Sequence, residues 1–269
     1  MLLSYFGELG YLIVFILPAY INYNFQQNVV IHTFDDYANI LSLYNKKNVT
    51  FKRQEFGSYY RCCAESDVST NRYQNLNRYL GVANVFDYKR VPNNMGTIMH
   101  SPINVNYTGK ILLFPRCRGG KDYGYVSPEI YDEIINIFKH KEIVLCGKAS
   151  ESHNMDKYNL KRIEMLEVIS ACKTADLCIV PDSGFASLLI ASGVKKIVII
   201  FNDDYTSQRN TYFHIDVYHK TAKWFKINYY IVDNKYILDF LRNDGFNKEK
   251  CCMLIILIQS CMKTKNKQK

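Results

Sequence analysis

The tripeptide Asp182-Ser183-Gly184 carries the clearest chemistry in this 269-residue sequence. The apolar run Leu177–Val180 before it predicts a buried parallel strand, and the small and apolar residues after it predict a helix that opens at this turn. The first N–H groups of a helix lack partners within the helix, and the helix dipole adds positive charge there. The turn therefore predicts an anion site that suits a diphosphate, with the alternative that Asp182 or Ser183 only caps an ordinary helix.

Two other loops carry groups that suit the same ligand. Arg116 and Lys121 flank two glycines after the expected strand 111–114, while Gly147 and Glu151 follow the next expected strand. Loops that follow parallel strands meet at one edge of the sheet. We expect Arg116 and Lys121 to contact phosphate and Glu151 to accept hydrogen bonds from ribose hydroxyls. Taken singly, each cation is more simply explained as a solvated loop charge, and the case for a ligand depends on the three loops meeting at one edge.

Glu8 is the candidate for acid–base chemistry. It follows Gly7 in a turn between an expected first strand and an apolar helix. A sugar transfer needs a carboxylate near the acceptor hydroxyl and positive potential at the departing phosphate. Glu8 could serve as the general base, and the alternative is a solvated turn carboxylate.

The order of apolar runs predicts the elements that position these residues. Strands and helices alternate, which predicts an α/β fold with parallel sheets. The expected strands are 1–5, 28–33, 111–114, 142–146, 177–180 and 195–201. The expected helices are 12–23, with a kink or early end at Pro18, and 36–43, 128–140, 159–171 and the one after Ser183. The order of elements between residues 45 and 106 stays open.

This pattern predicts two Rossmann-like domains that face a cleft. Residues 1–106 would form a short N-terminal acceptor domain, residues 107–232 a donor domain, and residues 233–269 a C-terminal helix and basic tail.

Composition narrows the class of protein. The net charge of +9 is spread along the chain, and no basic and aromatic RNA-binding module is present, so we expect no nucleic-acid partner. The nine cysteines include no CxxC pair, and the acidic pairs lack Asp-x-Asp spacing, so we expect neither a metal nor a cofactor.

The apolar runs 11–20 and 253–258 are too short to cross a bilayer. The chain is expected to be cytoplasmic, and peripheral membrane contact through the C-terminal helix and tail stays open.

Four short motifs, in order along the chain, resemble the heptosyltransferase family of GT-B glycosyltransferases, which act on ADP-heptose. The motifs are Phe6-Gly7-Glu8, Phe114-Pro115-Arg116 with Lys121, Val144-Leu145-Cys146-Gly147 and Val180-Pro181-Asp182-Ser183-Gly184. The chain departs from the family in having Glu8 where the family has Asp, and Ser187 where a His is common.

The resemblance implies transfer of a sugar from a nucleotide-diphosphate donor to an acceptor, which we expect to be a glycan or glycolipid. Arg116, Lys121 and the helix N-terminus could stabilise the leaving diphosphate without a metal. It places Glu8 as the general base, Lys121 on phosphate, Glu151 on ribose, and Ser183 with Gly184 on the diphosphate. Two alternatives remain open at this point: a nucleotide-sugar epimerase of the same architecture, and a non-catalytic nucleotide-sugar-binding module.

Overall fold

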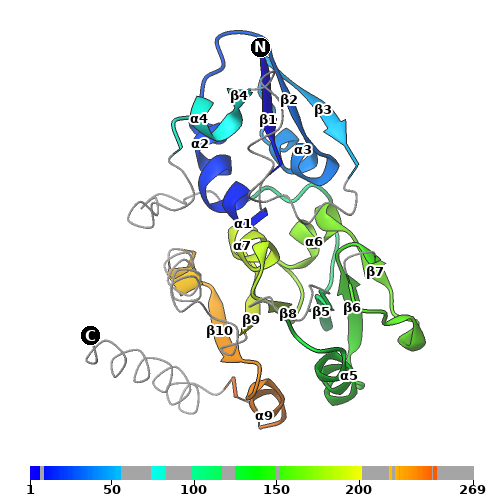
Figure 1. The fold of residues 1–269 in the computed structure, drawn as a ribbon. Coiled ribbons are helices and arrows are strands. Elements are labelled where there is room, and N and C mark those ends of the chain that lie inside the picture. Colours follow the sequence, from blue (N-terminus) through cyan, green and yellow to red (C-terminus); the bar gives the residue numbers. More distant parts are fainter. Residues whose placement is uncertain are drawn as a thin grey trace.

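Figure 1 shows the fold of the protein in a computed structural model. The structure describes residues 1–6, 9–55, 74–82, 99–116, 125–149, 152–201, 218–219, 222–223, 225–243 and 245–246. Glu8, Lys121 and Glu151 lie outside these residues, as does the whole segment 247–269 with its predicted helix and basic tail.

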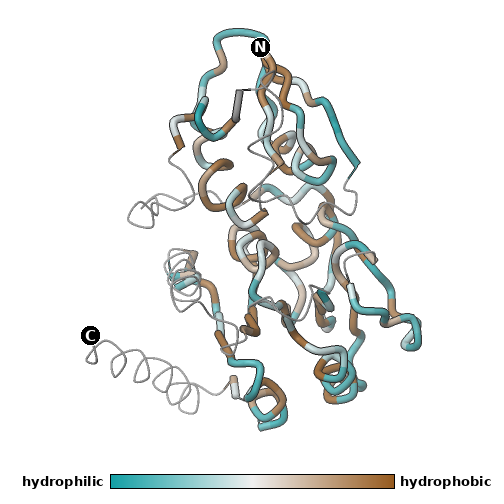
Figure 2. Tube along the Cα trace, viewed as in Figure 1, coloured by the Kyte–Doolittle hydropathy of each residue, from teal (hydrophilic) through white to brown (hydrophobic). Residues whose placement is uncertain are grey.

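The N-terminal part is a four-stranded parallel sheet in the order β3-β2-β1-β4. Its strands are β1 (Leu2–Tyr5), β2 (Val29–Phe34), β3 (Val49–Gln54) and β4 (Gln74–Asn75). Helices α3 (Asp35–Ser42) and α4 (Leu76–Tyr79) accompany it. The edge strand β3 is mostly exposed, and Figure 2 shows its second half as hydrophilic.

A continuous helical stretch follows β1, and Pro18 does not end it. The stretch consists of α1 (Leu9–Tyr11), the π-helical η1 (Leu12–Ile16) and α2 (Leu17–Asn22). Proline removes one helical hydrogen bond, and its ring collides with the carbonyl four residues earlier. The wider π turn directly before Pro18 relieves that collision, because it changes the hydrogen-bonding partner from four to five residues away. At the predicted kink, the helix thus contains a π-helical turn and continues past Pro18.

The C-terminal part is a six-stranded parallel sheet in the order β10-β9-β8-β5-β6-β7. Its strands are β5 (Lys110–Leu113), β6 (Glu142–Cys146), β7 (Arg162–Ile163), β8 (Leu177–Pro181), β9 (Lys196–Phe201) and β10 (Asn228–Asp233). Its helices are α5 (Pro128–Ile137), η6 (Asp156–Tyr158), α6 (Met165–Ala171), α7 (Gly184–Ala191) and α9 (Ile237–Arg242). Parallel sheets and alternating helices confirm the predicted α/β class.

The predicted helix 159–171 is wrong in its first half. Residues 162 and 163 form β7, which pairs with the end of β6 through Leu145–Arg162 and Cys146–Ile163. The helix begins only at Met165. The backbone of this segment therefore satisfies its hydrogen bonds at the edge of the sheet, a tertiary effect that the local residue pattern does not contain.

The two sheets share one hydrophobic cluster. Residues from the N-terminal sheet and from the helical stretch 9–22 pack with Met165, Ile169, Leu188 and Ala191 of α6 and α7. Figure 1 shows α1 and α7 next to each other between the sheets, and Figure 2 shows that this region is largely hydrophobic. The division of the chain at residues 106 and 232 stays a prediction.

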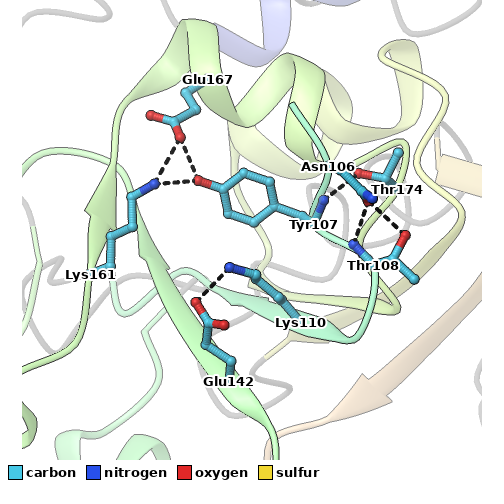
Figure 3. A network of polar contacts seen from close by, with 8 residues as sticks. All are labelled: Asn106, Tyr107, Thr108, Lys110, Glu142, Lys161, Glu167 and Thr174. Carbon is cyan, nitrogen blue, oxygen red and sulfur yellow. Dashed lines mark hydrogen bonds and ion pairs between the residues drawn. The ribbon is translucent and has the colours of Figure 1, made fainter. Parts of the chain in front are cut away.

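The connector before β5, residues 99–109, is fixed to the C-terminal part by polar contacts (Figure 3). The hydroxyl of Tyr107 donates to the carboxylate of Glu167, and Lys161 donates both to the Tyr107 oxygen at 2.7 Å and to Glu167 at 3.1 Å. The backbone N–H of Tyr107 donates to Thr174 at 2.9 Å. The ammonium groups of Lys110 and Lys161 lie 5.1 Å and 5.2 Å from the centre of the Tyr107 ring, so two lysines lie close to this aromatic side chain.

Within the described residues, the helices are too short or too polar to cross a bilayer.

Candidate functional site

The described part of the three predicted ligand loops lies at the carboxyl ends of adjacent strands. Arg116 follows β5, Gly147 follows β6, and Asp182 to Gly184 follow β8, and β5 lies between β6 and β8 in the sheet. The rings of Phe114 and Phe185 lie 5.3 Å apart and join the end of β5 to the start of α7. The structure thus brings these predicted residues to one edge, as parallel topology requires.

Asp182 is buried and holds the turn in place. Its carboxylate accepts a hydrogen bond of 2.6 Å from the hydroxyl of Tyr218, which also lies 3.2 Å from the carbonyl oxygen of Ser183. The Asp182 N–H donates to Ile200 in β9 at 2.7 Å. Asp182 therefore fixes the geometry of the turn, and its predicted contact with the ligand stays a prediction.

Ser183 presents an unsatisfied hydroxyl. The residue is the N-cap of α7 with extended backbone, yet its side chain makes no capping hydrogen bond. It is 7% exposed, and its Oγ has no hydrogen-bond partner among the described residues. A buried hydroxyl without a partner costs free energy, and a hydrogen bond to a ligand group would remove that cost.

Gly184 brings the first turns of two helices into contact. A Cβ built on Gly184 would lie 2.5 Å from the backbone nitrogen of Gly10 and 2.7 Å from Cβ of Leu9, both in α1. Leu9 opens the helical stretch after β1, and Gly184 opens α7, so the N-terminal ends of both helices meet here. Two positive helix ends in one place attract an anion more strongly than either alone. The absence of a side chain at Gly184 permits this helix contact. The predicted role of Gly184 in letting phosphate approach remains a prediction.

Gly147 makes a turn that other residues cannot make without strain. Its φ of +90° lies in the left-handed region, and a Cβ there would come 3.6 Å from the ring of Phe185. Arg162 of β7 donates to the Gly147 carbonyl at 3.0 Å and to Ser152 at 3.1 Å. Burial lowers the pKa of the Arg162 guanidinium. Arg162 therefore holds the loop after β6 in shape.

Arg116 ties its loop to the loop after β6. It pairs with Ser152 in an isolated antiparallel bridge, and its N–H donates to Phe114 at 2.8 Å. The buried His153 donates its backbone N–H to Pro115 at 2.7 Å, and its Nε2 lies 2.9 Å from the carbonyl oxygen of Val126. These contacts place Arg116 at the edge where a diphosphate is predicted.

The sequence alone did not predict an ion pair that connects the N-terminal and C-terminal parts of the protein. Lys148, directly after Gly147, lies 3.2 Å from the carboxylate of Asp36 in the first turn of α3. It also missed Tyr218 and Arg162 as residues that support the site. The position of Lys148 two residues after a predicted strand could have drawn attention to it, whereas its pairing with Asp36 depends on the packing of the two sheets.

Other features lie away from this edge. A cavity of about 410 Å³ is lined by Ser101, Pro102, Ile103, Asn104, Val105, Ser170, Lys173 and Thr174, which belong to the connector and to the end of α6 and the turn after it. None of these is a predicted ligand residue. Within the described ranges, no three His, Cys, Asp or Glu side chains gather as metal ligands.

No protein-family model matches the sequence, and no curated protein sequence matches it. The structure of E. coli ADP-heptose lps heptosyltransferase II is similar with a TM-score of 0.49 and 12% sequence identity, over 93% of this chain and 99% of that chain. The solved structures it resembles include heptosyltransferases.

Two further similar structures are of TibC. One is described as a bacterial iron-containing dodecameric glycosyltransferase from enterotoxigenic E. coli H10407, and the other as a heptosyltransferase in complex with ADP-D-beta-D-heptose. Both share 13% identity with this chain, at TM-scores of 0.42 and 0.40, over 74% of it. The chain spans only 57% of the length of TibC. At such values the likeness concerns the course of the backbone and says nothing about individual residues.

Proposed function

We propose that this chain transfers a sugar from a nucleotide-diphosphate donor to an acceptor hydroxyl, with the diphosphate bound where α1 and α7 meet. One observation carries the proposal: the N-terminal turns of α1 and α7 touch at Gly10 and Gly184. Beside this contact lies the buried hydroxyl of Ser183, which has no hydrogen-bond partner among the residues that the structure describes. Helix N-termini and a hydroxyl donor are the groups that bind phosphate oxygens.

The chemistry follows from this placement. The acceptor oxygen forms a bond to the anomeric carbon while the bond from that carbon to the diphosphate oxygen breaks. The acceptor proton passes to a carboxylate, for which Glu8 remains our candidate, and the nucleoside diphosphate leaves. The helix ends, Arg116 and Lys121 stabilise the charge on the leaving group, which needs no metal in this scheme.

Because the sequence motifs resemble those of the heptosyltransferase family, ADP-heptose is the first donor to test. The acceptor is proposed to be a glycan or glycolipid hydroxyl, bound on the side of the N-terminal sheet. Loop residues Glu151 and Gly147 are proposed to face the ribose.

Incubation with ADP-, UDP- and GDP-linked sugars and mixed glycan acceptors tests the proposal. We expect release of nucleoside diphosphate together with a glycosylated acceptor. Glu8→Gln should lower turnover roughly 10²-fold while donor affinity stays near that of the wild type. A changed sugar configuration without nucleotide release would indicate an epimerase. Binding without turnover would indicate a non-catalytic module.

A further inference from the structure

The Lys148–Asp36 ion pair joins the carboxyl ends of strands from the two sheets. Lys148 is the second residue after β6, and Asp36 is the second residue after β2, in the first turn of α3. The Nζ and Oδ2 atoms are 3.2 Å apart, and the side chains are 26% and 16% exposed. Both charges are therefore largely removed from water at the junction where the anion site is proposed.

Lys148 lies within reach of that site. Its neighbour Gly147 packs against the ring of Phe185, the second residue of α7. Strands β6 and β8 are separated only by β5, so they lie about 10 Å apart. The flexible four-carbon stem of a lysine can redirect its ammonium group without moving the backbone.

The charges favour an exchange of partners. The Asp36 carboxylate offers Lys148 a single negative charge, whereas a diphosphate brings more than one and offers several acceptor oxygens. Asp36 lies in the first turn of α3, where the helix dipole stabilises its carboxylate after Lys148 departs.

We propose, on the basis of the proposed function, that Lys148 is an additional donor-binding residue: it pairs with Asp36 as the structure shows and turns to the diphosphate when the donor binds. Asp36 thereby competes with the ligand for this lysine. A purely structural pair would instead join the sheets and leave ligand affinity independent of Asp36.

Titration calorimetry with ADP and with inorganic pyrophosphate tests the exchange in a double-mutant cycle. Lys148→Ala should weaken binding of both probes about tenfold, and Lys148→Arg should retain most of it. Asp36→Asn should tighten binding several-fold in the wild-type background and have no effect in the Lys148→Ala background. Circular dichroism confirms that each variant is folded.

Lys110→Ala is the matched control. Lys110 also forms an ion pair, with Glu142 at 2.7 Å, but at the opposite end of β5 and β6, so its removal should leave affinity for ADP and pyrophosphate unchanged.

If Asp36→Asn still tightens ligand binding in the Lys148→Ala background, the proposed exchange of partners by Lys148 is overturned, and Asp36 simply repels the ligand. Unchanged affinity in Lys148→Ala would also overturn it. If pyrophosphate binds and ADP does not, the nucleotide part of the proposed function fails while the pyrophosphate cycle still decides the role of Lys148. If neither binds, both proposals are wrong.

Discussion

Gly10 and Gly184 lie in backbone contact across the junction of the two sheets, where a Cβ on Gly184 would come 2.5 Å from the Gly10 nitrogen. This contact brings the openings of α1 and α7 together and so creates a place with positive potential from two helices. The same contact packs Leu9 and Leu188 into the hydrophobic cluster that both sheets share. Stability of the junction and ligand binding therefore depend on the same turn.

Gly184→Ala should destabilise the fold. The new methyl group would collide with the backbone at Gly10 and with Leu9, and such overpacking costs about 1–3 kcal/mol in the free energy of unfolding. Gly10→Ala is the comparison, because its Cβ would come no closer than 3.4 Å to Gly184 and should cost less. Urea unfolding measures both. Equal stability of Gly184→Ala and wild type would show that the helices do not approach this closely.

Ser183→Ala should separate binding from stability. The hydroxyl has no partner among the described residues, so its removal should leave the free energy of unfolding unchanged or raise it slightly. Loss of a hydrogen bond to a charged phosphate should weaken ADP binding about tenfold. Thermal unfolding and calorimetry on the same samples give both quantities. Full ADP affinity in Ser183→Ala would remove this residue from the site.

Tyr218→Phe should weaken both the fold and the site. The change leaves the buried Asp182 carboxylate without the 2.6 Å hydrogen bond from Tyr218, at a cost of about 1.5–3 kcal/mol. The Asp182 turn would relax, and ADP affinity should fall with it. Tyr20→Phe is the control, since the Tyr20 hydroxyl is buried without a hydrogen-bond partner among the described residues and its removal should cost little. Equal effects of the two substitutions would contradict a specific role for Tyr218.

Acid should weaken the connector contact at Glu167. The hydrogen bond from Tyr107, with a further contribution from Lys161, holds the pKa of Glu167 below its ordinary value despite burial. A lowered folded-state pKa gives stability that is complete above the unfolded value of about 4.3 and is lost as the pH falls through the folded value. Glu167→Gln should therefore cost about 1 kcal/mol at neutral pH and flatten the acid side of the stability curve.

Urea titrations between about pH 3 and 7 measure that difference. Glu133→Gln, which removes an exposed pair with Arg242, is the control and should change the curve little. A Glu167→Gln curve parallel to that of the wild type would show that this carboxylate does not contribute to the acid dependence.

Much of the fold can be predicted because each buried strand appears in the sequence as a short run of apolar residues. Strand β6 matches its prediction residue for residue, and β1, β2, β5, β8 and β9 lie within one or two residues of theirs. Helices α3 and α7 were placed by acidic or small residues at their first turns, and parallel topology then placed Arg116, Gly147 and Ser183 at one edge.

The remainder depends on contacts between distant segments. Strand β7 forms because the edge of β6 offers hydrogen bonds, although residues 160–164 resemble a helix locally. The contact of Gly184 with Gly10, the Lys148–Asp36 pair and the Tyr218–Asp182 bond each join residues more than 30 positions apart. A single sequence shows the residue types at both ends of such contacts but not that they meet.

A crystal structure of the protein with ADP tests the central claim most directly. We predict a diphosphate oxygen within hydrogen-bond distance, about 2.5–3.2 Å, of Ser183 Oγ and beside the first turns of α1 and α7. Lys148 should then have left Asp36 and turned to the phosphate. Nucleotide bound elsewhere, for example in the cavity beside Ile103 and Lys173, with Ser183 still unpartnered, would contradict the account.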